Sequence, residues 1–309
     1  MPLAPEIMRY LAAQAISGAP DVNQAPLSVI RAGTYNRIVL AGKPQKIFSI
    51  QDRYISGSTS DLHIRIYRPS SAENLPALVY FHGGGWVLNF LDIYDAELSD
   101  LANASGSVIV AVNYQKAPEH PYPIPFNDCF ATFLWVHKNA HDLGIDPEKV
   151  GIGGESAGGN LAAAVALKTR DISGPKPAYQ LLINPCNEKD FDTASYREYA
   201  QGYGLTRERM IWFWEQYLQG TDHDKDPYAC PSTAVDFSDL APAIIVTAEC
   251  DPLKDDGIKY EKLLRGCGVQ THYLEYEGMI HGFTNLGAIT PKAHEAISDC
   301  ALLIRKIVN

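Results

Sequence analysis

The sequence is poor in the features that build disulfides or metal sites. Its six cysteines are scattered at positions 129, 186, 230, 250, 267 and 300, with no Cys-x-x-Cys pair and no paired Cys/His spacing. Several of them lie in apolar runs, where a cysteine is usually a small core residue. We therefore expect no disulfide, no metal and no cofactor, and a reducing, cytoplasmic setting.

Long hydrophobic runs and an excess of positive charge are also missing. No apolar run approaches the ~18 residues of a membrane span, and residues 1–20 lack a basic start followed by an apolar segment. Acidic residues number 36 against 26 basic ones, giving a formal charge of −10 without long runs of one sign. This balance argues against nucleic acid and anionic membranes as partners and favours a small uncharged molecule.

What the sequence does contain is a serine enclosed by glycines. The apolar run 150–152 leads into Gly154-x-Ser156-x-Gly158, and an alanine-rich helical pattern follows over residues 161–170. A serine on a tight strand-to-helix turn has little room around it, so glycines at two-residue spacing fit it, and the turn exposes the hydroxyl. Small residues also mark ordinary turns, but the order of strand, turn and helix favours Ser156 as a nucleophile.

Apolar runs and helical patterns alternate along most of the chain, which predicts an α/β protein. Besides the strand before Ser156, we predict strands at 46–54, 61–67, 78–81, 107–113, 179–184, 243–248 and 272–276. Helices are predicted at 126–139, 206–218, 257–265 and 291–308. The first two strands, joined by a serine-rich turn, are typical of an antiparallel start to the sheet.

A glycine-rich loop follows the buried strand 78–81. The pentapeptide His82-Gly83-Gly84-Gly85-Trp86 leaves backbone N–H groups uncovered by side chains, as a site for a tetrahedral oxyanion requires. A plain glycine turn is the alternative, but the flanking histidine and tryptophan make the pattern more specific. We interpret His82 as a hydrogen-bonding residue that shapes the loop rather than as a catalytic base.

An acid and a base are also predicted beyond strand ends. Asp251, fixed by the proline after it, is placed to orient a base, with Glu249 as the alternative. Asp255 and Asp256 are predicted to cap the following helix. His281, in a glycine-flanked loop after the last strand, completes the order Ser156, Asp251, His281, which is the order of α/β-hydrolases.

Two segments are predicted to form a cap beside a catalytic domain at 46–309. The N-terminal part, residues 1–45, begins with an amphipathic helical pattern, and an insertion at about 187–225 carries Trp212, Phe213 and Trp214. Both segments could instead be helices that pack on the core. Trp86, Leu205, Phe213 and Ile280 are candidate substrate-binding residues, with the same alternative.

Together these motifs resemble the hormone-sensitive-lipase-like carboxylesterases of the α/β-hydrolase superfamily. The resemblance rests on residues 82–86, 114–123, 153–160, 251–257 and 281–283. It implies a mostly parallel eight-stranded sheet flanked by helices, a helical cap, and oxyanion N–H groups on Gly84, Gly85 and Ala157. It also suggests a homodimer through the sheet edge.

Two residues depart from the family pattern. Glu155 stands where the family usually has Asp, which keeps the charge, and Gln115 replaces a frequent Arg, which puts a structural ion pair in doubt.

We therefore predict a serine esterase that hydrolyses short- to medium-chain carboxylic esters through an acyl-enzyme. Because the base must be neutral, its activity should fall as the pH drops through roughly 6 to 7. The alternatives are an amidase or arylformamidase on the same fold, and a non-catalytic ligand-binding module similar to plant hormone receptors.

Overall fold

The computed structural model describes residues 3–17, 25–220 and 222–309. Eight strands form one sheet in the order β1-β2-β4-β3-β5-β6-β7-β8. Only the pairs β1/β2 and β2/β4 are antiparallel, so the predicted antiparallel start and the mostly parallel sheet are confirmed. The strands are β1 (Ser49–Ser56), β2 (Asp61–Arg68), β3 (Leu75–Phe81), β4 (Val108–Val112), β5 (Ile145–Glu155), β6 (Gln180–Ile183), β7 (Ala243–Cys250) and β8 (Thr271–Ile280).

The composition of each strand matches its place in the sheet. β4 and β7, in the interior of the sheet, are buried at every residue and consist mainly of Val, Ile and Ala. Such continuous apolar runs are typical of parallel strands covered on both faces. β1 lies at one edge, is exposed at most positions and carries Asp52 and Arg53, charges that discourage pairing with another chain.

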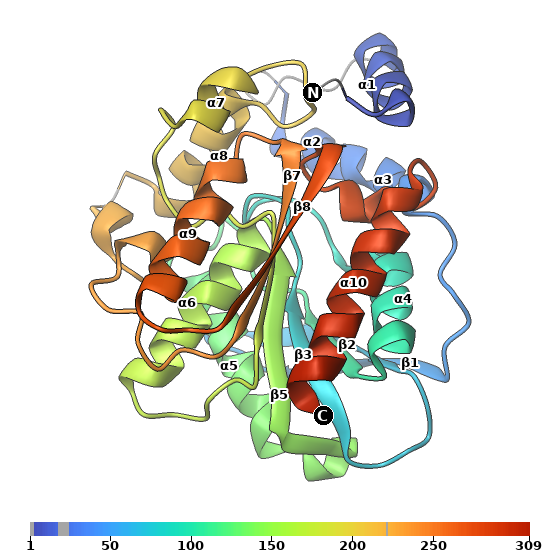
Figure 1. Ribbon diagram of the computed structural model, residues 1–309, viewed down its shortest axis with the longest axis vertical. Coiled ribbons are helices and arrows are strands. Elements are labelled where there is room, and N and C mark those ends of the chain that lie inside the picture. The colour runs from blue at the N-terminus through green and yellow to red at the C-terminus, as the bar shows by residue number, and fades with distance from the viewer. Residues whose placement is uncertain (1–2, 18–24, 221) are drawn as a thin grey trace.

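Helices cover both faces of the sheet (Figure 1). α4 and α10 pack together over one face, and α5, α6 and α9 cover the other, so two apolar clusters form the core. The helices are α1 (Pro5–Ser17), α2 (Leu27–Gly33), α3 (Arg37–Ala41), α4 (Asp95–Ser105), α5 (Ile124–Lys138), α6 (Ala157–Asp171), α7 (Ala194–Glu198), α8 (Arg207–Leu218), α9 (Lys254–Gly266) and α10 (Pro291–Val308). All six cysteines are free thiols, and five of them are buried.

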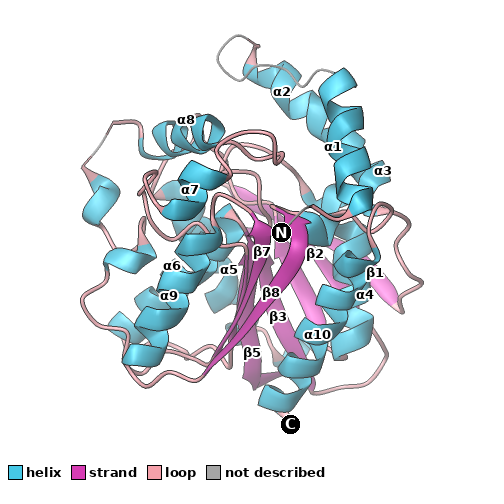
Figure 2. Ribbon diagram, turned by 45° about the horizontal axis from the view of Figure 1, so that its top comes forward, coloured by secondary structure: helices cyan, strands magenta, loops and turns pink. Residues whose placement is uncertain are grey.

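The remaining helices gather at one end of the sheet. Figure 2 shows α1, α2, α3, α7 and α8 beyond the tips of β7 and β8, where the parallel strands have their carboxyl ends. These helices belong to the two segments predicted as a cap, of which residues 1–2, 18–24 and 221 lie outside the described part. An added Cβ at Gly204 would contact Leu11 of α1 and Ile280 of β8, so the two segments and the sheet meet there.

Three differences from the predictions concern α4, α9 and β8. α4 was not predicted from the sequence, α9 begins at Lys254 instead of 257, and β8 continues to Ile280. The earlier start of α9 also corrects the predicted capping roles, because Asp255 and Asp256 lie in its first turn. The Asp255 carboxylate accepts a hydrogen bond from Ser195 N instead (2.9 Å). Asp256 is buried, and this burial raises its pKa well above the ordinary value.

Candidate active site

Ser156 lies on a strained turn between β5 and α6. Its φ of 57° and ψ of −119° are unusual for a residue with a side chain, and such strain is concentrated at functional sites. The flanking glycines explain how the turn fits. A Cβ on Gly154 or Gly158 would overlap the carbonyl oxygen of Phe81, so the start of α6 packs directly on the end of β3. The turn predicted from Gly-x-Ser-x-Gly is therefore present.

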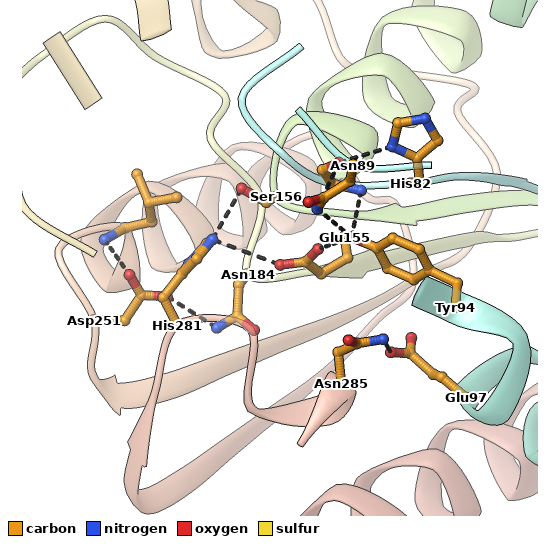
Figure 3. A network of polar contacts seen from close by, with 12 residues as sticks. His82, Asn89, Tyr94, Glu97, Glu155, Ser156, Asn184, Asp251, His281 and Asn285 are labelled. Carbon is orange, nitrogen blue, oxygen red and sulfur yellow. Dashed lines mark hydrogen bonds and ion pairs between the residues drawn. The ribbon is translucent and has the colours of Figure 1, made fainter. Parts of the chain in front are cut away.

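The three residues predicted as nucleophile, base and acid form one chain of hydrogen bonds (Figure 3). Ser156 Oγ lies 2.9 Å from His281 Nε2, and His281 Nδ1 lies 2.8 Å from Asp251 Oδ2. With Nδ1 protonated toward the carboxylate, Nε2 is free to accept the serine proton. All three side chains follow directly after β5, β7 and β8, at the carboxyl end of the sheet.

Asp251 is itself held by two donors. Asn184 Nδ2 donates to Oδ2 (3.0 Å), and Leu253 N donates to Oδ1 (2.9 Å), while the carboxylate is fully buried. Glu249, the alternative acid, instead accepts a hydrogen bond from Gly278 N (2.7 Å). The geometry therefore favours Asp251 as the residue that orients His281. The contribution of Asn184 was missed from the sequence, although an asparagine at the end of a predicted strand could have indicated it.

Opposing effects set the pKa of His281. Burial alone would lower it, but the carboxylates of Asp251 and Glu155 outweigh burial and the nearby Arg37 cation, and the pKa rises above the ordinary value of 6.5. Glu155 Oε1 lies 3.5 Å from His281 Nε2. This carboxylate, next to the serine in sequence, was noted only as a departure from the family pattern, and its contact with the base was not predicted.

The glycine loop after β3 is held by hydrogen bonds. His82 Nδ1 donates to Gly83 O (2.7 Å), and its ring stacks on Tyr114. Burial, helped by the Lys116 cation, lowers the pKa of His82 well below its ordinary value, so the ring is neutral at pH 7. Tyr94 accepts from Gly83 N (2.9 Å) and donates to Glu155 (2.9 Å), which ties the loop to the residue before Ser156. His82 shapes the loop and does not contact the Ser156 and His281 pair.

Three N–H groups of the predicted oxyanion site have no hydrogen-bond acceptor among the described residues. Within residues 25–220 and 222–309, the amides of Gly84, Gly85 and Ala157 donate no hydrogen bond to another residue. A Cβ at Gly158 would lie within 2.9 Å of His82 O, which places the start of α6 against the glycine loop. The N-terminus of α6 also directs its dipole to this point.

The four candidate substrate-binding residues occupy different places. Trp86 is fully buried and stacks on Tyr217, with ring centres 4.2 Å apart. The ring of Phe213 lies against Gly85, where a Cβ would overlap it. Ile280 precedes His281 and approaches Gly204, and Leu205 is partly buried against the core. Phe213 and Ile280 thus adjoin the predicted oxyanion loop and the predicted base, respectively.

Gln115, the second departure from the family pattern, forms hydrogen bonds to Asp128. Its backbone N donates to Asp128 Oδ2 (3.0 Å), and its side-chain amide donates to the same oxygen (3.1 Å). Gln115 is thus linked to Asp128 by hydrogen bonds, and its uncharged side chain forms no ion pair there.

Neither a metal cluster nor a membrane span is found in the part of the chain that the structure describes. In residues 3–17, 25–220 and 222–309, no three His, Cys, Asp or Glu side chains are grouped so that they could hold a metal ion. No helix in the same ranges has the length and apolar character needed to cross a membrane.

Comparison with known proteins agrees with the fold. A family model described as alpha/beta hydrolase fold matches residues 78–285. The carboxylesterase NlhH of Mycobacterium tuberculosis is 39% identical over 241 residues, which cover 77% of this chain and 76% of its own. The arylesterase of Saccharolobus solfataricus is 33% identical over 92% of both chains. The solved structure of a hyperthermophilic esterase from Pyrobaculum calidifontis aligns with a TM-score of 0.94 and 37% identity over 99% of both chains.

The fold is therefore that of an α/β hydrolase. Within that superfamily, the chain belongs to the hormone-sensitive-lipase-like carboxylesterases.

Proposed function

We propose that this protein hydrolyses short- to medium-chain carboxylic esters through an acyl-enzyme formed on Ser156. The coarser assignment, a carboxylic ester hydrolase, follows from its family and from relatives named carboxylesterase, arylesterase and ethyl acetate hydrolase. The observation that carries the finer proposal is the hydrogen-bonded chain from Ser156 through His281 to the buried Asp251. Activation of a serine hydroxyl group near neutral pH requires such a hydrogen-bonded base and acid.

The first half-reaction transfers the acyl group. Ser156 Oγ attacks the ester carbonyl carbon while His281 Nε2 takes the hydroxyl proton, and Asp251 stabilises the resulting imidazolium. The amides of Gly84, Gly85 and Ala157 bind the oxyanion, each such donor being worth ~3 kcal/mol of transition-state stabilisation. The imidazolium then gives its proton to the departing alcohol oxygen, which leaves the acyl group on Ser156.

The second half-reaction uses the same groups in reverse. Water gives a proton to His281 Nε2 as its oxygen attacks the acyl carbon. Collapse of the second tetrahedral intermediate returns the proton to Ser156 Oγ and releases the carboxylic acid. No cofactor takes part in either half of this sequence.

We further propose that residues 1–45 and 187–225 act as a cap over this centre. The meeting of Leu11, Gly204 and Ile280, and the packing of the Phe213 ring on Gly85, support this role. Trp86, Leu205, Phe213 and Ile280 then belong to or support the substrate pocket. A homodimer through the sheet edge and a cytoplasmic location stay predictions.

The test uses p-nitrophenyl esters from acetate to palmitate, together with an anilide of a short acid. Ser156→Ala should abolish turnover, whereas Ser71→Ala, which changes an exposed serine in the loop before β3, should leave it unchanged. A burst of p-nitrophenol equal to the enzyme concentration would mark the acyl-enzyme. Faster anilide cleavage would instead favour an amidase, and tight ester binding without turnover would favour the receptor-like alternative.

A further inference from the structure

Two arginines near the site lack a counter-charge among the described residues. Arg37 lies at the start of α3 and Arg209 in the first turn of α8, and the Nε atom of each is buried without a hydrogen-bond partner. Across residues 3–17, 25–220 and 222–309, neither guanidinium group forms an ion pair or donates a hydrogen bond to another side chain or to a carbonyl.

The other partly buried arginines of this chain behave differently. Each of them bonds a carboxylate or a backbone carbonyl, as expected because an isolated buried charge is costly. These arginines are Arg31, Arg65, Arg68, Arg170 and Arg207. The contrast indicates that the partner of Arg37 and Arg209 is an anion that the described residues do not supply.

Both guanidinium groups adjoin the candidate active site. A Cβ on Gly282, the residue after His281, would lie 3.3 Å from Arg37 Nη2. The Arg209 guanidinium carbon lies 5.7 Å from the centre of the Phe213 ring, and that ring packs on Gly85 of the glycine loop. One arginine is therefore on the side of the base, and the other is on the side of the oxyanion loop.

The two cations are also close enough to influence each other. Burial, with the Arg37 cation as the second cause, lowers the pKa of Arg209, and the Arg37 charge opposes protonation of His281. α3 and α8 approach the tips of β7 and β8 from opposite sides (Figures 1 and 2). An anion held between them would relieve this repulsion.

A carboxylate beside Gly282 is already engaged. Glu155 Oε2 accepts a hydrogen bond from the Tyr94 hydroxyl group (2.9 Å), and Oε1 lies 3.5 Å from His281 Nε2. A Cβ on Gly282 would lie 3.4 Å from Glu155 Oε1, yet Glu155 and Arg37 form no ion pair. Glu155 therefore faces the base and leaves the Arg37 guanidinium for another partner.

We propose that the preferred esters of this enzyme carry a carboxylate, which Arg37 and Arg209 bind while Ser156 attacks the ester group. This substrate class rests on the proposed ester hydrolysis. A guanidinium group presents a planar fork of donors that matches a carboxylate, so two of them can fix such a substrate in one orientation. The net charge of −10 favoured an uncharged substrate, but the field of distant surface charges is screened within about 10 Å, and the two adjacent cations outweigh it.

The test compares matched esters by titrating the acid that is released at constant pH. Monomethyl glutarate and methyl valerate differ by a carboxylate in the acyl part, and 3-acetoxypropanoate and propyl acetate differ by one in the alcohol part. Rates are measured on the alkaline plateau of the pH profile, because removing Arg37 also changes the pKa of His281. The wild type should turn over at least one carboxylate ester with a kcat/KM at or above that of its neutral partner.

Arg37→Gln and Arg209→Gln should lower kcat/KM for that carboxylate ester by about 10- to 100-fold, mainly through KM. The rates on both neutral esters should change by less than about threefold, because these esters carry no carboxylate for the arginines to bind. Arg207→Gln is the matched control. It removes a charge from α8, the helix that carries Arg209, but the Arg207 guanidinium group already pairs with Asp192. Arg37→Lys and Arg209→Lys retain the charge and should recover part of the loss.

The outcomes separate this proposal from the proposed function. If the wild type disfavours both carboxylate esters by more than about tenfold, or if the variants lose activity equally on charged and neutral esters, the arginines do not select the substrate. The proposed function would fail differently, through the absence of Ser156-dependent hydrolysis of any of the four esters. The wild-type comparison needs no variant, so a folding defect in a variant cannot leave the proposal undecided.

Discussion

Replacing Asp251 by asparagine is the sharpest test of how the site works. The carboxylate accepts hydrogen bonds from His281 Nδ1, from Asn184 Nδ2 and from Leu253 N. An amide has only one oxygen. If that oxygen faces Leu253, the new NH₂ group faces His281 and Asn184. The imidazole ring must then present a bare Nδ1 to the NH₂ donor and carry its proton on Nε2.

A proton on Nε2 prevents His281 from accepting the proton of Ser156. The same exchange in serine proteases lowers kcat by ~10⁴, or about 5 kcal/mol of transition-state stabilisation, and we expect a loss of about 10³- to 10⁴-fold here. The fold should survive. One buried donor, that of Asn184 or Leu253, loses its acceptor, and this costs about 1–3 kcal/mol of the free energy of unfolding.

The assay is steady-state hydrolysis of p-nitrophenyl butyrate, with urea unfolding to measure stability. Glu249→Gln is the matched control, since it changes the alternative acid two residues earlier in the chain and should leave kcat within about threefold. A loss of less than tenfold in Asp251→Asn, or an equal loss in Glu249→Gln, would refute the assignment of Asp251.

Two further predictions follow from the surroundings of the site. On the acid side, kcat/KM should fall with a midpoint above pH 6.5, because His281 must be neutral and its pKa is raised. Glu155→Gln should move that midpoint to lower pH. A midpoint that stays in place would exclude Glu155 as a cause of the raised pKa. Gly158→Ala should destabilise the protein by at least about 1–3 kcal/mol, because its Cβ would overlap Phe81 O. Gly266→Ala, where a Cβ meets nothing within 4 Å, is the control in urea unfolding, and equal stability of the two variants would contradict the packing argument.

The sheet was predictable because its signals are local. A strand buried on both faces needs a short apolar run, and β4 and β7 consist of such runs, so their positions follow from composition alone. The three residues of the hydrogen-bonded chain were also predictable. Each follows directly after a strand, and parallel strands bring their carboxyl ends to the same edge of the sheet.

Elements with polar buried faces were not predictable in this way. Six of the eleven residues of α4 are polar, and two of them, Glu97 and Asp100, are buried charged residues. Glu97 accepts a hydrogen bond from the Tyr80 hydroxyl group (2.9 Å), and burial raises the pKa of Glu97 to about 7. Gly257 was predicted to begin a helix, but it lies within α9, where a Cβ would lie 2.6 Å from the Thr247 side chain. A glycine required for close packing gives the same local signal as one that begins a helix.

The division between what was and was not predicted has a physical basis that bears on function. The proposed reaction depends on short-range motifs, because a serine, a histidine and an aspartate must each follow a strand end with the right turn. The proposed choice of substrate depends on Arg37 and Arg209, which no motif marks and which only the packing of two helices far apart in sequence brings to the site. An unpaired charge can be recognised only when its surroundings are known, since the same arginine on a surface would be solvated and uninformative. In this chain, the motifs therefore indicate the proposed ester hydrolysis, and the two buried arginines indicate the proposed substrate class.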